Sequence, residues 1–159
     1  MKITSNAFMH EGMIPSVYTC DGEGISPPLH ISEIPTQAVS LVLFVDDPDI
    51  PQVVKERMNI EVFDHWVLYN IDVTQLSEVE IPENSHVGLM GVNTRGNQEY
   101  GPPCPPPEYE PSMHRYFFKV YALDAMLSIS EGATKDQVAS MISEHIVDEA
   151  LLVGLYSRK

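Results

Sequence analysis

The sequence predicts a single mostly-β domain over residues 1–159, in which two antiparallel sheets pack as a Greek-key sandwich with a peripheral C-terminal helix. Three observations predict this fold class. Several short apolar runs have the length and alternation of strands, Gly- and Pro-rich turns separate them, and one helical pattern occurs late in the chain. A chain of 159 residues with 43% hydrophobic and 20% charged residues can form one core.

Four segments have the pattern of strands. Residues 3–8 alternate apolar and polar side chains, which is typical of an edge strand. Residues 41–45 are continuously apolar, which indicates a strand buried on both faces, and they lead into the Asp-rich turn of residues 46–51. Residues 64–71 form the next predicted strand. In the strand of residues 115–122, alternation places four side chains on one face: His114, Tyr116, Phe118 and Val120.

One helix is predicted near the C-terminus. Thr134 and Gln137 fit a capping box, and apolar residues then recur at helical spacing, at Val138, Met141, Ile142 and His145. Residues 150–156 fit either a strand or a bent junction of helix and strand. Residues 52–63 fit either one short helical turn or a loop.

The net charge limits the partners that we expect. Nine lysines and arginines against 23 aspartates and glutamates give a net charge of -14. A nucleic-acid-binding face is basic, and so is a surface that docks on anionic lipid, so the composition argues against both. Any anion that binds must be held by local hydrogen-bond donors against an unfavourable overall field.

Cysteine use and the N-terminus bear on the cellular compartment. Cys20 and Cys104 do not have the spacing of a metal motif and are too few for a disulfide framework, so a single bridge between them stays open. Residues 1–6 contain no apolar signal core, and no apolar run is long enough to span a bilayer. We therefore expect a soluble, cytoplasmic protein.

A stiff loop comes before the strand of residues 115–122. Residues 100–107 are rich in proline, and each proline fixes its own φ, so the loop can hold neighbouring groups at little entropic cost on binding. With His114 and Tyr116 at the mouth of an apolar strand face, this arrangement suggests a small polar pocket. From these residues alone, a surface loop followed by an ordinary strand is the better interpretation.

Five motifs occur in a meaningful order along the chain. They are Ile-Ser-Pro-Pro-Leu at 25–29, Asp-Pro-Asp at 47–49, His-Trp-Val with Asn-Ile at 65–71, Tyr-Gly with Pro-Cys-Pro-Pro at 100–106, and His-Arg-Tyr at 114–116. Together they resemble the phosphatidylethanolamine-binding protein family, also called the Raf kinase inhibitor family, and its bacterial branch in particular. The resemblance continues into residues 145–158 and covers nearly the whole chain. Each motif is weak alone, but five in order make chance a poor explanation.

The resemblance implies two antiparallel sheets with a peripheral helix and a small pocket for phosphate, acetate or a phosphorylated head group. Matched motif by motif, the ligand-binding residues would be Asp47, Asp49, His65, Gly101, Pro103, His114 and Tyr116. Family members are generally binding and regulatory proteins, so no catalytic activity or cofactor is implied. Possible partners are a phosphorylated protein side chain and a protein such as a kinase. The bacterial branch is similar to proteins that form homodimers.

Two departures from the family pattern affect the pocket. The family loop usually has Gly-Gly-Pro where this chain has Gly101-Pro102-Pro103, and Pro102 removes a backbone N–H that could face an anion. The segment between Pro51 and His65 is also longer than the bacterial branch leads us to expect. It can reshape the pocket rim or the dimer surface.

An oxyanion needs several donors in a partly dry site. The candidate donors are two imidazoles, a hydroxyl and a backbone N–H, in His65, His114, Tyr116 and Gly101. Asp47 could accept a hydrogen bond from a histidine, which fixes the tautomer and favours the imidazolium. Alternatively, Asp47 or Asp49 could face the ammonium group of a phosphoethanolamine-like ligand.

Two other classes of function stay open. A metal-dependent enzyme would use His65, His114 and a carboxylate such as Asp47 as ligands, although no local His-x-x-x-His spacing supports a metal. No Gly-x-Ser-x-Gly motif indicates a serine hydrolase. A protein-interaction module would dock through residues 102–107, presented as a polyproline ligand.

Overall fold

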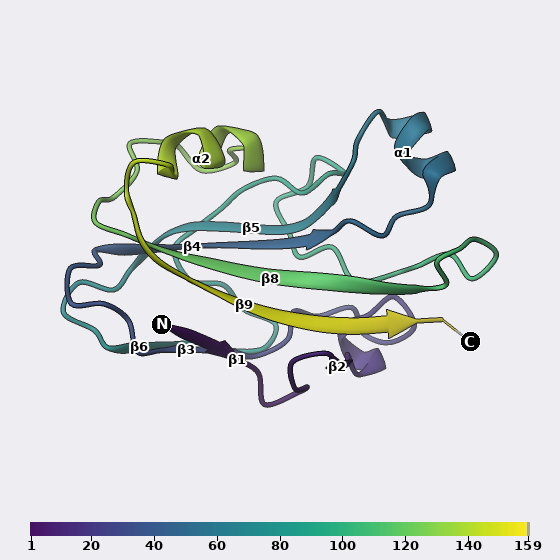
Figure 1. The fold of residues 1–159 in the computed structure, drawn as a ribbon, viewed down its shortest axis with the longest axis horizontal. Coiled ribbons are helices and arrows are strands. Elements are labelled where there is room, and N and C mark those ends of the chain that lie inside the picture. The colour runs from purple at the N-terminus through teal and green to yellow at the C-terminus, as the bar shows by residue number, and fades with distance from the viewer. Residues whose placement is uncertain (159) are drawn as a thin grey trace.

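Two β-sheets of unequal size form the body of the molecule (Figure 1). The structure is a computed structural model, and it describes residues 1–158. The smaller sheet has the order β1-β3-β6, with β1 at Lys2–Thr4, β3 at Leu29–Ser32 and β6 at Glu78–Ile81. The larger sheet has the order β2-β9-β8-β4-β5-β7. Its strands are β2 (Gly12–Met13), β4 (Ser40–Asp47), β5 (Phe63–Asp72), β7 (Leu89–Met90), β8 (Met113–Leu123) and β9 (Ile146–Ser157).

The larger sheet contains a Greek key. Its strands β4, β5, β7 and β8 lie in the order β8-β4-β5-β7, so the fourth strand returns to lie beside the first. These pairs are antiparallel, whereas the two-residue strand β2 pairs in parallel with β9 at the edge. The predicted mostly-β sandwich is therefore confirmed, with one parallel pair at its margin.

The central strand β4 is buried at every residue because both of its faces are covered. Leu41, Leu43 and Val45 belong to the core between the two sheets. Val42 and Phe44 belong to a second core on the outer face, beneath α2 (Lys135–Ile142). Figure 1 shows α2 on the side of the larger sheet opposite the smaller sheet. The prediction of a strand buried on both faces is confirmed.

Helix α2 begins at the predicted capping box. The Thr134 hydroxyl accepts from the Gln137 N–H at 3.2 Å, and Gln137 Oε1 accepts from the Thr134 N–H at 2.9 Å. His145 was predicted on this helix, and that prediction is wrong. The helix ends before it because the chain turns to enter β9, and Nδ1 of His145 hydrogen-bonds Asp124 at 2.8 Å instead.

The structure settles three segments that the sequence left uncertain. Helix α1 covers Gln52–Met58 and ends at Asn59, whose φ of 54° lies in the left-handed region that terminates many helices. It lies beyond the ends of β4 and β5 (Figure 1). The C-terminal segment is a strand, since β9 pairs with β8 along its length. The N-terminal edge strand is β1, which is shorter than predicted.

A disulfide joins Cys20 to Cys104, a bridge that the sequence left open. Cys20 follows the short 3₁₀ helix η1 (Ser16–Tyr18), and its N–H donates to the Pro103 carbonyl at 3.0 Å. Because disulfides are typical of oxidising compartments, this bridge does not favour a cytoplasmic location, which stays a prediction. Within residues 1–158, no helix is long and apolar enough to cross a membrane.

Replacing both cysteines by serine should lower the free energy of unfolding by about 2–4 kcal/mol. The reason is that the bridge closes a loop across a sequence separation of 84, which restricts the unfolded chain. Denaturant unfolding of the native protein and the double variant measures this loss. A reductant should destabilise the native protein by the same amount and leave the variant unchanged. Equal midpoints for both proteins would refute a stabilising role.

Candidate functional site

Strand β4 ends in two consecutive carboxylates that point to opposite faces of the sheet. On the helix side, Asp46 accepts from Nζ of Lys135 at 2.7 Å. On the other side, Oδ2 of Asp47 accepts from Nδ1 of His114 at 2.7 Å, and its Oδ1 accepts from the N–H of Asp49 at 2.8 Å. The Asp-Pro-Asp turn therefore folds back on its own first carboxylate and presents that carboxylate to β8.

Neighbouring histidines hold Asp47 in its charged form. The residue is only 2% exposed, and burial alone would raise the pKa of its carboxyl group. The hydrogen bond from His114 and the proximity of His65 together outweigh burial and hold this pKa below its ordinary value. Nε2 of His65 lies 3.9 Å from Oδ2 of Asp47. One buried anion thus faces two imidazoles.

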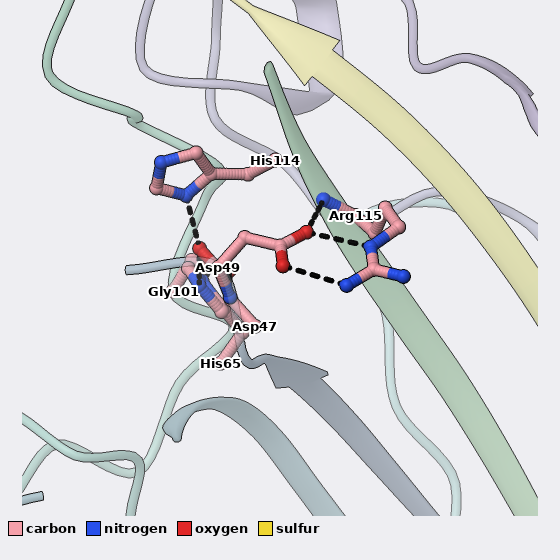
Figure 2. A network of polar contacts seen from close by, with 6 residues as sticks. All are labelled: Asp47, Asp49, His65, Gly101, His114 and Arg115. Atoms are coloured by element: carbon pink, nitrogen blue, oxygen red, sulfur yellow. Dashed lines mark hydrogen bonds and ion pairs between the residues drawn. The ribbon is translucent and has the colours of Figure 1, made fainter. Parts of the chain in front are cut away.

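Each of these histidines has one ring nitrogen fixed by an acceptor (Figure 2). Nδ1 of His65 lies 2.6 Å from the carbonyl oxygen of Gly101, and Nδ1 of His114 lies 2.7 Å from Asp47. A carbonyl and a carboxylate only accept, so each Nδ1 carries a proton. The Nε2 atoms are therefore the ring nitrogens that remain for a ligand.

Two buried polar atoms at this site have no hydrogen-bond partner among residues 1–158. They are Nε2 of His114 and the hydroxyl of Tyr116, in residues that are 1% and 0% exposed. The two rings stack with centroids 6.4 Å apart, and the Tyr116 ring packs edge-on against His65 at 5.2 Å. Burial raises the pKa of Tyr116, so its hydroxyl stays protonated and can donate. A buried polar atom without a hydrogen-bond partner destabilises the folded protein. Two such atoms on stacked rings therefore indicate a ligand site.

A cavity of about 560 Å³ opens beside His114, a size typical of small-molecule pockets, and Tyr116 is buried without lining it. Asp47, His65 and His114 line it, and the Phe63 ring packs against His65 with centroids 4.8 Å apart. Helix α1 and the proline loop supply the remaining walls. The sequence did not predict the contribution of α1, because nothing local shows that the turn at 48–51 places this helix over the pocket.

Asp49, which the resemblance assigns to ligand binding, does not line the cavity. Both of its carboxylate oxygens accept from the Arg115 guanidinium at 2.8 Å, and one also accepts the Arg115 N–H at 2.9 Å (Figure 2). Hydrogen bonding to Arg115 lowers the pKa of Asp49. In this arrangement Asp49 fixes the start of β8, the strand that carries His114.

Gly101 lies beside the site but cannot donate to an anion there. Its N–H donates to the His65 carbonyl at 2.7 Å, so the prediction that this N–H is a ligand donor is wrong. A Cβ at this position would lie 3.3 Å from the same carbonyl oxygen, which makes glycine the residue that fits this close approach. Gly101 therefore positions His65 from both sides, through its N–H and through its carbonyl.

The proline segment of residues 102–107 forms part of the cavity wall. Pro103 and Pro105 are buried, and Pro107 is the exposed proline of the segment. Pro102 and Pro106 are half-buried and line the cavity. Pro103 itself does not line the cavity, and it holds the loop through its hydrogen bond to Cys20. The segment therefore shapes the pocket more than it displays a polyproline strip.

The metal hypothesis can be compared with the same geometry. Within residues 1–158, no group of three or more His, Cys, Asp or Glu side chains is placed to hold a metal ion. Asp47 already accepts two hydrogen bonds, and the Nδ1 atoms of His65 and His114 are occupied. The side chains of Asp47, His65 and His114 are thus arranged to hydrogen-bond with one another and with the backbone.

The fold is that of a known class of β-sandwich proteins. The sequence profile described as phosphatidylethanolamine-binding protein matches residues 4–157. The chain belongs to the phosphatidylethanolamine-binding protein family.

Relatives and solved structures agree with this assignment. A protein of Chlamydia trachomatis named UPF0098 protein is 42% identical over 159 residues, with 99% of each chain covered. A UPF0098 protein of Methanothermobacter thermautotrophicus is 42% identical over 163 residues, again with 99% of each covered. The crystal structure of a phosphatidylethanolamine-binding protein homologue from Chlamydia trachomatis superposes with a TM-score of 0.88 at 42% identity, covering 99% of this chain and 97% of that one. The E. coli protein YbcL, at 24% identity, shares the fold with a TM-score of 0.82, covering 99% and 98%.

Replacing Asp47 by asparagine should lower the free energy of unfolding at pH 7 by about 1–3 kcal/mol, because a buried charged hydrogen bond to His114 is lost. The pKa of Asp47 in the folded protein lies below its unfolded value of 3.8. The contribution of Asp47 to stability is therefore complete above pH 3.8 and is lost as the pH falls from there through the folded pKa. Urea unfolding of both proteins between about pH 6 and pH 3 measures this dependence.

The matched control for this experiment is Asp72→Asn, which removes an exposed carboxylate whose hydrogen-bond partner is the nearby Thr74. It should change stability much less than Asp47→Asn does. The difference between native protein and Asp47→Asn should shrink on acidification. A difference that stays constant down to the lowest pH would contradict an ionised Asp47 in the folded protein.

Proposed function

We propose that this protein binds a small oxyanion, phosphate or a phosphorylated group, at His114, Tyr116 and His65. The observation that supports this proposal best is the pair of buried polar atoms, Nε2 of His114 and the Tyr116 hydroxyl oxygen, that have no hydrogen-bond partner among residues 1–158. A phosphate oxygen that accepts from both would remove two unfavourable groups at once. The adjoining cavity gives such an anion a path and space for its substituent.

Asp47 makes the binding of an anion at this site reasonable. With Nδ1 of His114 bonded to Asp47, Nε2 can donate to an anion only from the imidazolium, so a bound anion would have the protonated ring between itself and the carboxylate. The same holds for His65, whose Nδ1 is bonded to the Gly101 carbonyl and whose Nε2 lies 3.9 Å from Asp47. The carboxylate therefore does not act on the ligand directly. It would balance the charge of the rings that donate to the anion.

The expected ligands share a phosphate group whose terminal oxygens are free to accept hydrogen bonds. Free phosphate, a phosphoethanolamine-like head group and a phosphorylated side chain of a partner protein all carry it. A regulatory role, in which a partner such as a kinase docks at the cavity rim, rests on the family alone. The homodimer and the cytoplasmic location likewise stay predictions.

Inorganic phosphate should bind to the native protein with a stoichiometry near one, and His114→Gln should weaken it at least about tenfold, because a charged donor is lost. Titration calorimetry is the suitable measurement. Fluorescence is less direct, because Trp66, the single tryptophan, packs against Tyr100 and lines a different cavity. Tyr116→Phe removes only the hydroxyl and should also weaken binding.

The matched control is His145→Gln, the same substitution at an exposed histidine that pairs with Asp124, remote from the cavity. It should leave phosphate binding as it is in the native protein. Equal affinities for the native protein and for both site variants would refute the proposed site. A folded His114→Gln protein, judged by its thermal transition, is required for the comparison.

Phosphoethanolamine should bind no more tightly than methyl phosphate, which carries a neutral substituent in place of the ammonium group. Both oxygens of Asp47 and both oxygens of Asp49 already accept hydrogen bonds, so neither carboxylate is free for an ammonium group. Calorimetric competition between the two ligands measures the difference. A clear preference for phosphoethanolamine that Asp47→Asn abolishes would restore the ammonium hypothesis.

A further inference from the structure

Most basic residues of this acidic chain pair with carboxylates, and the exceptions lie at the cavity. Of its nine lysines and arginines, all except Lys159 lie within the described residues. Six of these eight form an ion pair within 4.0 Å: Lys2, Lys55, Arg115, Lys119, Lys135 and Arg158. The other two, Arg57 and Arg95, have no carboxylate partner among residues 1–158. Both of these arginines line the cavity that His65 and His114 also line.

The two arginines reach the cavity from separate parts of the fold. Arg57 lies on α1, and Arg95 lies in the turn that follows β7. The Arg95 guanidinium lies over the Phe63 ring, 5.8 Å from its centroid, and Phe63 in turn packs against His65. A row of guanidinium, aromatic ring and imidazole therefore runs from the exposed rim to the buried histidine.

Apolar side chains line the same cavity, among them Ile50, Val54, Met58, Pro105 and Tyr109. The charged groups that face it are, besides the two arginines and the two histidines, the carboxylates of Asp47 and Glu108. Asp47 is already bonded to His114, so Glu108 is the remaining carboxylate. The cavity is thus lined by two exposed arginines, two buried histidines and apolar side chains.

We propose that Arg57 and Arg95 bind a second anionic group of the ligand, so that the ligand class is a phosphate ester with an apolar or aromatic middle and a carboxylate or second phosphate beyond it. This inference rests on the proposed function, which places the first anion at His114. A guanidinium presents a planar set of donors that matches such groups in two-point contacts. Exposed arginines together with buried histidines suit two anionic groups better than one.

An alternative effect of the same arginines is general attraction. Two cations at a rim raise the encounter rate of any anion, whatever its shape. Attraction of this kind grows with the total charge of the ligand but does not depend on where the second anionic group lies. A direct contact with the second group depends on its position. Two ligands of equal charge that differ in the position of that group therefore separate the two explanations.

The probes are phenyl phosphate and 4-carboxyphenyl phosphate, which share the phosphate and the ring and differ by one carboxylate. A homologue with two more methylenes before the carboxylate covers a longer separation. In calorimetry at constant ionic strength, one of the two carboxylated probes, which carry the same charge, should bind the native protein about tenfold more tightly than phenyl phosphate and clearly more tightly than the other. The double variant Arg57→Gln/Arg95→Gln should remove the preference between the two carboxylated probes.

The matched control is Lys55→Gln, which removes one positive charge from the same helix at a residue that does not line the cavity. It should keep the preference for the carboxylated probe. Glu108→Gln removes the opposing carboxylate at the rim and should increase the preference.

Three results would overturn the inference, and they differ from one another. Failure of inorganic phosphate to bind would overturn the proposed function and this inference together. Binding of phenyl phosphate with no gain from either carboxylate would overturn this inference alone. Equal weakening of the two carboxylated probes by the double variant would assign the arginines to general attraction and would also overturn it.

Discussion

The carboxylate of Asp47 is the group on which the site depends. It accepts from the N–H of Asp49, which closes the turn after β4, and from His114 at the start of β8. It also faces His65 at the start of β5. These contacts follow from the Greek-key order, because β4 lies between β5 and β8 and so receives one histidine from each side. Without the long return from β7 to β8, the two imidazoles would not meet at one carboxylate.

Asp46, the residue before Asp47, connects the opposite face of β4 to helix α2. Asp46 accepts from Lys135 at the first position of α2, and Lys135 also reaches Asp64 at 2.8 Å. Burial lowers the pKa of Lys135, but Asp46 and Asp64 outweigh it and hold that pKa above its ordinary value. Helix α2 and the proposed anion site are thus fixed to one rigid strand from opposite sides. A site held on a sheet in this way would lose little freedom on binding.

Sequence patterns predicted most of the fold because its strongest signals are local. The continuous apolar run of β4, the alternation in β8 and the capping box at Thr134 each specify their element without knowledge of the rest. His145 shows where such local patterns fail, because its spacing in the sequence fits the helix although the chain leaves the helix after Ile142. At the site, motifs placed His65 and His114 together. They could not show that Asp49 bonds to Arg115, that the N–H of Gly101 is occupied, or that α1 covers the cavity, because these depend on non-local contacts.

The proposed anion site, in a chain with a net charge of -14, would have to work at short range. Beyond a Debye length of about 8–10 Å, salt screens the repulsion from the distant carboxylates, so their field would weaken binding only moderately. Inside a partly dry cavity, hydrogen-bond donors act at lower effective dielectric, where each contact is stronger than it would be in water. The affinity of the proposed site would then depend on how many donors a ligand satisfies at once. The buried histidines and the unpaired arginines at the rim would favour a ligand whose charges match their positions.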